Sequence, residues 1–178
     1  MSGELPVVVA DANVYVDAVT QDHRGLLGTP PSLHHIPSLP PKTVHPALHL
    51  LGIVRDGSDT GQGPALAISD HILLMVVHAL VRAGLTKDGV RAYAYALRAL
   101  AERSTGGYHA DVPRTQHDCQ DPEDNRILDL AVLVDADLIV TNDSDLLILG
   151  RGQGWKGRAI VTPTRFVGLA DAVARGMR

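Results

Sequence analysis

Aromatic residues are scarce in this sequence, in which phenylalanine, tryptophan and tyrosine make up 3% of 178 residues. Proteins that bind single-stranded nucleic acids by stacking need several exposed rings, and this chain has too few to build such a platform. An excess of basic charge is lacking as well, because the formal net charge is -4. Proteins that coat nucleic acids neutralise phosphates with lysine and arginine, so the charge argues against that class. An acidic excess suits a site in which carboxylates surround a cation.

Cysteine and long apolar runs are also nearly absent. Cys119 is the only cysteine, so the chain cannot form an intramolecular disulfide, and one thiolate is too few for a thiolate metal site. The first residues lack the basic start and the long apolar stretch of a secretion signal, and no run approaches the roughly 18 apolar residues of a membrane span. We therefore expect a cytoplasmic protein that does not contact the membrane.

The composition that remains is typical of a folded globular domain, with 45% hydrophobic and 20% charged residues. The length favours one domain over residues 1–178, because domains usually hold about 100 to 200 residues. A proline- and histidine-rich stretch at residues 20–43 is predicted to be a long loop inserted in this domain, since proline is excluded from helix interiors. Loops of this length are usually functional or mobile, and the sequence leaves both alternatives open.

Short apolar runs mark the expected strands. Residues 5–10 form a β-branched apolar run, which predicts a strand buried on both faces of a parallel sheet. Further strands are predicted at residues 65–69, at residues 136–141 and around Ile160. The glycine-rich segment GSDTGQG, which precedes the second strand, is predicted to be a turn.

Helical spacing separates these strands. Helices are predicted at residues 44–55, from Ser69 or Asp70 to residue 83, at residues 87–102, from Asp121 onward and at the C-terminus. In the segment DPEDNRIL, Asp121 is expected to cap the helix and Pro122 to occupy its first turn. The order of elements predicts the α/β class, with a mostly parallel central sheet in a three-layer α/β/α sandwich.

Acidic residues follow two of the predicted strands directly. Asp11 comes after the first strand, Asp143 and Asp145 come after the strand at residues 136–141, and Asp124 begins the helix that leads into that strand. Open parallel sheets place their sites at the carboxyl ends of the strands. Carboxylates that gather there raise each other's pKa unless a cation neutralises them. A hard divalent cation, Mg2+ or Mn2+, would resolve the repulsion and could direct a water molecule at a phosphodiester.

Three segments, VVVADANVYVDA, DPEDNRILDLA and ADLIVTNDSDLL, resemble in this order the motifs of PIN-domain proteins. The resemblance is closest to the branch formed by the toxin components of bacterial toxin-antitoxin pairs. It implies an α/β/α sandwich and a metal-dependent endoribonuclease that hydrolyses RNA with Mg2+ or Mn2+. It also implies a small antitoxin protein as a partner, and homodimers are common among such proteins.

The resemblance assigns roles to residues of the three segments. Asp11, Asp124 and Asp143 would be the catalytic residues that bind the metal ion, and Asp145 would support them. Asn13 and Thr141 would be polar neighbours that orient the carboxylates and water.

One position departs from the family pattern. A glutamate is usual on the helix after the second strand, but the segment SDHILLMVVHAL has Met75 there, and a thioether is a poor ligand for a hard cation. His71 and His78 share a helical face with Met75, so imidazole could replace the carboxylate and favour Mn2+ or another transition metal. Alternatively, the protein is a catalytically impaired PIN domain that acts as an RNA-binding or protein-interaction module.

A remote alternative is a phosphohydrolase of the haloacid-dehalogenase kind, which also has an acid after its first strand. Its signature needs a second aspartate where Asn13 stands, and a lysine before the last acidic motif. The three lysines of the chain, Lys42, Lys87 and Lys156, are not well placed for this role.

Other charged residues receive weaker interpretations. Arg126, Arg151 and Arg158 flank the expected site and are candidates for phosphate contacts. Four further acids lie within or beside predicted helices and are expected on solvated faces, namely Asp17, Asp129, Asp135 and Asp137.

Overall fold

Five parallel strands form one sheet in the computed structural model, which describes residues 6–20 and 45–176. The central strand β1 (Val7–Ala10) lies between β2 (Ala65–Ser69) and β4 (Leu138–Val140). The edge strands are β3 (Tyr108–His109) and β5 (Ala159–Val161). The predicted α/β class and parallel sheet are thus confirmed.

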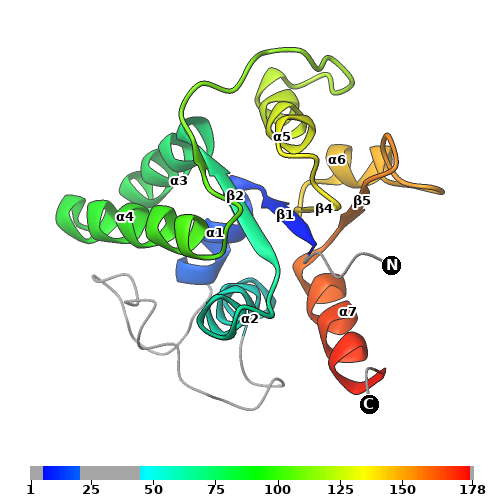
Figure 1. Cartoon of the computed structure of the whole chain (residues 1–178). Coiled ribbons are helices and arrows are strands. Elements are labelled where there is room, and N and C mark those ends of the chain that lie inside the picture. The colour runs from blue at the N-terminus through cyan, green and yellow to red at the C-terminus, as the bar shows by residue number, and fades with distance from the viewer. Residues whose placement is uncertain (1–5, 21–44, 177–178) are drawn as a thin grey trace.

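Seven helices surround this sheet in the described residues. They are α1 (Ala12–Thr20), α2 (Pro46–Thr60), α3 (Asp70–Arg82), α4 (Lys87–Arg103), α5 (Pro122–Leu133), α6 (Ser144–Leu149) and α7 (Pro163–Gly176). The strands β2 and β3 follow β1 on one side, whereas β4 and β5 lie on its other side. Because crossovers between parallel strands are right-handed, this change of side places α5 on the face opposite to the earlier helices. In Figure 1, α5 and α6 lie above the sheet and α2 and α7 lie below it.

The strand register brings two distant parts of the chain together. Ala10, the last residue of β1, pairs with Val140, the last residue of β4. Because the strands are parallel, Asp11 and Thr141 leave the sheet side by side at its carboxyl edge. Asp11 donates its backbone N–H to the carbonyl of Val140 at 2.9 Å, which fixes this junction.

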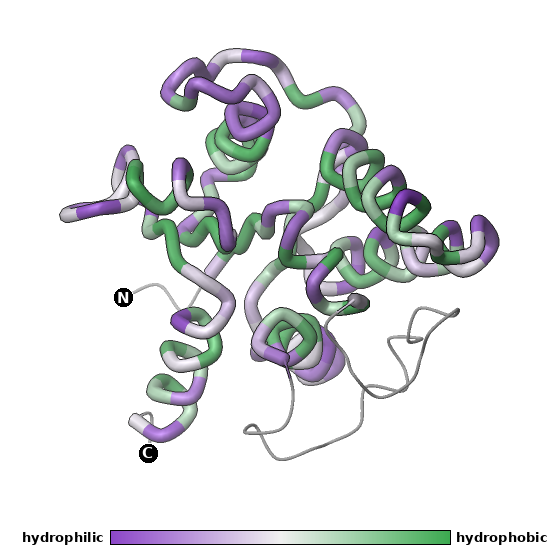
Figure 2. The backbone as a smooth tube through the Cα atoms, turned by 180° about the vertical axis from the view of Figure 1, so that it is seen from behind, coloured by the Kyte–Doolittle hydropathy of each residue, from purple (hydrophilic) through white to green (hydrophobic). Residues whose placement is uncertain are grey.

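The core consists of the strands and the inward faces of the helices. Val8, Val9 and Ala10 are fully buried, as expected for a strand covered on both faces. Figure 2 shows hydrophobic residues along the central strands and hydrophilic residues on the outer turns of the helices. None of the helices in the described part of the chain combines the length and the apolar character needed to cross a lipid bilayer.

The structure corrects three details of the predicted elements. The helix predicted at residues 44–55 continues to Thr60 and ends where Gly61 adopts a left-handed conformation (φ 68°). Four of the seven residues of the predicted GSDTGQG turn are therefore helical. The strand β3 and the helices α1 and α6 were not predicted, and β3 and α6 are too short to show a period. Of the predicted loop at residues 20–43, only Thr20 is described, and it ends α1.

Candidate metal centre

Asp11 occupies the carboxyl end of β1 and is 9% exposed. Its Oδ2 accepts one hydrogen bond from Thr141 Oγ1 and one from Asn13 Nδ2, each at 2.7 Å. Burial raises the pKa of Asp11 above its ordinary value, although the hydrogen bond from Thr141 opposes this effect. A carboxylate in this position is costly unless it is paired or bound to a cation.

Thr141 connects Asp11 to the next acid. The Thr141 hydroxyl is fully buried, and while it donates to Asp11 it also accepts the backbone N–H of Asp143 at 2.8 Å. Asn13 reaches the same loop, since its Oδ1 accepts the backbone N–H of Asn142 at 3.3 Å. Asn13 and Thr141 thereby hold the loop after β4 against the end of β1.

Three carboxylates converge beside this loop. Asp143 caps α6, where its Oδ1 accepts the backbone N–H of Asp145 at 2.7 Å. Asp124 lies in the first turn of α5. One oxygen from each of Asp124, Asp143 and Asp145 lies within 4.8 Å of the others. An all-oxygen donor set of this spacing fits Mg2+ or Mn2+, since both prefer carboxylate and water ligands.

The electrostatics of the three-carboxylate group also favour a bound cation. Burial raises the pKa of Asp124 to about 7, and the negative charges of Asp143, Asp11, Asp121 and Asp145 add to this rise. Asp11 therefore belongs to the same electrostatic cluster. Mutual repulsion of this kind is relieved when a divalent cation neutralises the group.

The start of α5 positions Asp124. Asp121 caps the helix by accepting the backbone N–H of Glu123 at 2.8 Å, and Pro122 follows it, as the sequence predicted. Asn125 adds a clamp that the sequence did not reveal. Its side chain accepts the N–H of Cys119 at 2.9 Å and donates to the carbonyl of Cys119 at 2.8 Å.

Burial raises the pKa of the Cys119 thiol to about 11, so this cysteine is a weak nucleophile.

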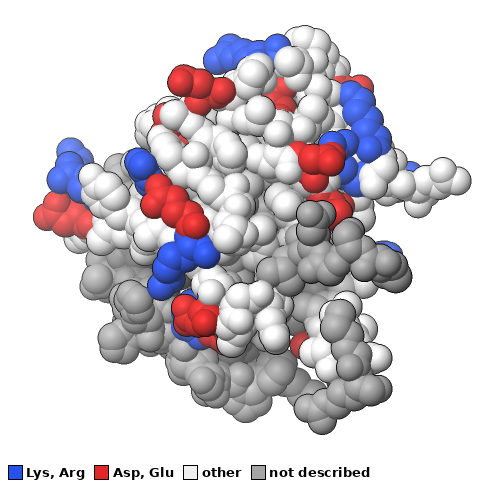
Figure 3. Space-filling model, viewed as in Figure 1, with Lys and Arg blue, Asp and Glu red and all other residues white. Residues whose placement is uncertain are grey.

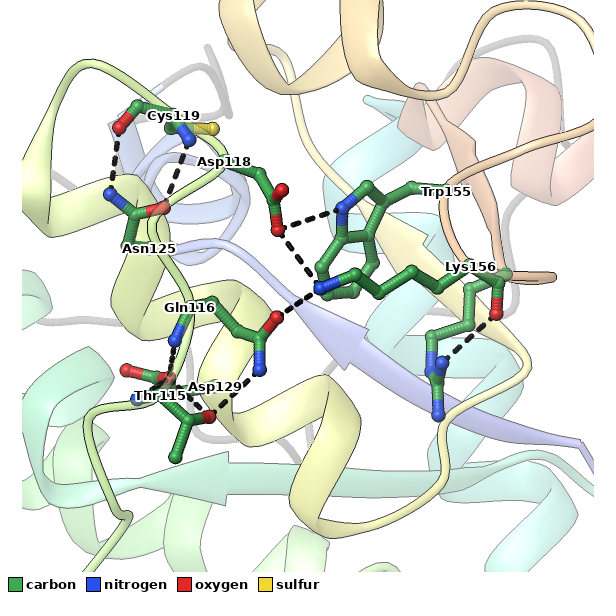
Figure 4. A network of polar contacts seen from close by, with 9 residues as sticks. Thr115, Gln116, Asp118, Cys119, Asn125, Asp129, Trp155 and Lys156 are labelled. Carbon is green, nitrogen blue, oxygen red and sulfur yellow. Dashed lines mark hydrogen bonds and ion pairs between the residues drawn. The ribbon is translucent and has the colours of Figure 1, made fainter.

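A second anchor for α5 is Asp129, which is 3% exposed. Its carboxylate accepts the backbone N–H groups of Thr115 and Gln116 at 2.7 and 2.8 Å, as seen in Figure 4, and it pairs with Arg126 Nη1 at 2.9 Å. The expectation that Asp129 lies on a solvated face was therefore wrong. Its sequence position could not show that the loop before α5 folds back over it.

The same loop is fastened to the turn before β5. Lys156 Nζ and Trp155 Nε1 both donate to Asp118 Oδ2, at 3.0 and 3.3 Å, and Lys156 also donates to Gln116 (Figure 4). These contacts tie the loop at residues 112–119 to residues 155–158. The loop that precedes Asp124 is thus held at two points.

The two histidines considered as replacements for the family glutamate lie in different surroundings. His71 Nε2 is 2.8 Å from Glu123 Oε2, which brings the start of α3 against the start of α5. Burial lowers the pKa of His71, although Glu123 opposes this effect. His78 is exposed, and Met75 is half-buried on α3. The carboxylate group found in the described residues contains neither histidine, so their role as ligands stays a prediction.

The three candidate arginines also differ. Arg126 pairs with Asp129 and donates to the carbonyl of Val112, and Arg158 pairs with Asp135 Oδ1 at 2.7 Å. Arg151 is exposed. On the face shown in Figure 3, basic side chains lie in small groups among acidic ones rather than in a broad basic surface. Phosphate contacts by these three residues remain predictions.

One comparison with known proteins agrees with this geometry. The family model of the PIN domain matches residues 7–145, which include all three acidic motifs and Met75. No curated protein and no solved structure matches the chain. PIN domains are generally nucleases that bind divalent metal ions, and the match displaces the haloacid-dehalogenase alternative. The chain therefore belongs to the PIN domain family.

Proposed function

We propose that this protein is a metal-dependent endoribonuclease that hydrolyses phosphodiester bonds of RNA in the cytoplasm with Mg2+ or Mn2+. The observation that carries the proposal is the convergence of Asp124, Asp143 and Asp145 within 4.8 Å, with Asp11 in the same electrostatic cluster. These residues come from three separate segments. Helix capping accounts for Asp143, and the first-turn positions suit Asp124 and Asp145, but these local roles do not account for the convergence of the three carboxylates. Repelling carboxylates destabilise a fold unless a cation joins them.

Each residue of the site has a defined part in this proposal. Asp11, Asp124 and Asp143 hold the cation, and Asp145 supports them. Asn13 and Thr141 keep the Asp11 carboxylate in one orientation through their 2.7 Å hydrogen bonds. A bound divalent cation would supply a water molecule of lowered pKa and would neutralise charge on the phosphate.

Cleavage of a mixed panel of RNA and DNA strands tests the proposal. We expect RNA to be cut in Mg2+ or Mn2+ and to stay intact in chelator. Asp143→Asn should lower the rate by about 100-fold, because it weakens the site while asparagine still caps α6. Asp171→Asn, on α7 and outside the carboxylate group, is the matched control. Equal cleavage by the parent and Asp143→Asn, or cleavage in chelator, would contradict the proposal.

A second candidate function rests on Met75. A PIN domain without the family glutamate could bind RNA, or another protein, without cutting. Metal-dependent cleavage by the parent would reject this candidate, and RNA binding without cleavage in either metal would support it.

Met75→Glu provides a direct test of what the missing acid costs. Met75 is one helical turn from His71, whose contact with Glu123 shows that this face of α3 meets the start of α5. We expect Met75→Glu to raise Mn2+ affinity and cleavage by about tenfold or more, since it adds a hard ligand. Leu74→Glu adds the same charge on a side chain that is 52% exposed and should have no effect. Equal effects of the two substitutions in calorimetry would show that only net charge matters.

The toxin role and its partners form the remaining part of the proposal. We infer a small antitoxin that covers the acidic site, and a homodimer, because the three motifs resemble those of toxin-antitoxin ribonucleases. Production of the parent in a bacterial host is expected to arrest growth, and production of Asp143→Asn is not. Unchanged growth with a parent that cuts RNA in vitro would remove the toxin role but leave the nuclease.

A further inference from the structure

The described residues form a polar hollow of about 460 Å3 along the open edge of β5, here called the β5 hollow. Its lining includes Arg151 after α6 and Arg165 in the first turn of α7, and no aspartate or glutamate among the described residues. We infer that the β5 hollow binds a backbone phosphate of the RNA strand that the metal centre cuts. This inference rests on the proposed function, for which it supplies an anion subsite.

Charge is the first argument. Arg151 and Arg165 are both exposed, and no ion pair joins either of them to an acid in the described part of the chain. Arg126 and Arg158 differ in this respect, since each already neutralises a carboxylate. Two guanidinium groups that share a hollow without a counter-charge favour an anion, and their planar forks suit phosphate oxygens.

The position of the β5 hollow is the second argument. Val161, at the carboxyl end of β5, lines it and pairs with Val140, the strand residue that precedes the metal-site loop. Leu147 also lines the hollow and lies on α6, the helix that Asp143 caps. The hollow and the carboxylate group are therefore separated by one strand spacing and one short helix. An RNA strand that reaches the metal centre can extend into it.

The backbone of the β5 hollow supports the same chemistry. Ala159 donates its N–H to Asp137 and Val161 accepts from Thr141, so both face β4. Because backbone groups alternate along a strand, the N–H of Ile160 points away from β4. Gly154 adopts φ 84°, and a Cβ at this position would lie 2.3 Å from the carbonyl oxygen of Arg158. Glycine is therefore required where the turn passes close to Arg158, and this turn forms one wall of the β5 hollow.

A second hollow of similar volume in the described residues is less suited to phosphate. It lies between α3 and α4 and includes Asp70 beside lysine and arginine, with mostly apolar side chains between them. Arg98, its basic residue next to Tyr108, already pairs with Glu102 at 2.9 Å. We therefore assign the phosphate to the β5 hollow alone.

Binding of a short fluorescein-labelled single-stranded RNA, measured by anisotropy in chelator at several salt concentrations, tests the inference. Arg151→Gln/Arg165→Gln should weaken RNA binding at least about fivefold. The salt slope, which is the slope of log Kd against log salt concentration, should fall by about 1.4, since each phosphate contact on a single strand contributes about 0.7. In cleavage assays the same variant should raise KM and leave kcat unchanged. Arg103→Gln/Arg175→Gln removes the same charge from exposed positions at the ends of α4 and α7 and should behave as the parent.

Five outcomes test the subsite and separate it from the nuclease. Equal binding by the parent and Arg151→Gln/Arg165→Gln overturns the subsite. An equal loss of binding in the control variant Arg103→Gln/Arg175→Gln also overturns it. A parent that binds no RNA overturns it as well. Arg151→Lys/Arg165→Lys should restore the salt slope, and its failure to do so would point to a folding defect and also overturn the subsite. If the parent binds RNA through these arginines but cuts none in any metal, the subsite stands and the proposed nuclease function falls.

Discussion

At the scale of single residues, the environment of each acidic side chain determines its pKa. Asp11 and Asp124 are both buried enough to disfavour their charged forms, and neighbouring acids add to the effect. Asp129 is buried too, yet the N–H groups of Thr115 and Gln116 outweigh its burial, and the pKa of this carboxyl lies below its ordinary value. The carboxylates with raised pKa therefore lie where a cation can neutralise them, whereas Asp129, whose hydrogen bonds outweigh its burial, anchors a loop.

The raised pKa of Asp124 predicts a pH dependence of stability. Between pH 3.8 and about 7, the unfolded chain has released this proton while the folded protein retains it. The free energy of unfolding of the metal-free protein should therefore fall as pH rises through this window, and Asp124→Asn should remove that part of the fall. Urea denaturation in chelator at a series of pH values measures both proteins. Parallel curves for the two proteins would show that Asp124 ionises normally.

The same ionisation couples metal binding to protons. Mn2+ binds the carboxylate form, so its affinity for the parent should rise with pH up to about 7 and then level off. Calorimetry in buffers of different ionisation enthalpy detects the released proton. A metal affinity that does not change between pH 5 and 7 would contradict this coupling.

At the scale of elements, α5 is the part that completes the site. Its first turn carries Asp124, and its third turn carries Asp129, which binds the loop at residues 112–119. The contacts of Trp155 and Lys156 with Asp118 tie the same loop to the turn before β5. The helix and its loop are therefore joined to each other and to the turn before β5, so contacts remote from Asp124 and Asp143 help to set the distance between them.

Asp129→Asn should loosen this element. Losing the charged acceptor for two N–H groups and for Arg126 is expected to lower the free energy of unfolding by about 2 kcal/mol or more at neutral pH. Because the folded pKa of Asp129 is depressed, the difference from the parent should shrink as pH falls through that pKa. Asp135→Asn, which affects an exposed pair with Arg158, should cost less than about 1 kcal/mol. Equal losses in urea denaturation would refute the anchoring role.

At the scale of the whole molecule, the parallel sheet gathers segments that are distant in sequence. Strand order places β1 beside β4, so residues 11 and 141 meet, and the reversal after β3 brings α5 over the same edge. The repulsion between the gathered acids is a cost of folding that the whole domain bears. A ligand that binds only the folded state should therefore stabilise the entire protein.

Thermal unfolding measures that stabilisation. Saturating Mn2+, at about 100 times its Kd, should stabilise the parent by about 2.7 kcal/mol and raise Tm by about 5 to 10 °C. The Tm of Asp143→Asn should hardly respond, and NaCl at matched ionic strength should not reproduce the shift. An equal rise in both proteins would mean that the ion binds outside the carboxylate group.

Much of the fold and most of the candidate metal ligands could be predicted from the sequence alone. Apolar β-branched runs specify the buried strands, since only burial on both faces accommodates them. Asp121 and Pro122 mark the start of α5 because a helix leaves its first N–H groups without partners. Asp11, Asp124 and Asp143 could be selected because they stand at the ends of strands or the start of a helix, and a parallel sheet collects such positions at one edge.

Only the tertiary structure decided how these residues meet. The burial of Asp129 depends on a loop that folds back from residues 112–119, and local spacing carries no signal for a contact across 14 residues. The same holds for two of the arginines, because whether Arg158 or Arg151 already has an acidic partner depends on packing between elements. Sequence periodicity reports which face of an element is apolar, whereas charge pairing and pKa values depend on neighbours that only the folded chain supplies.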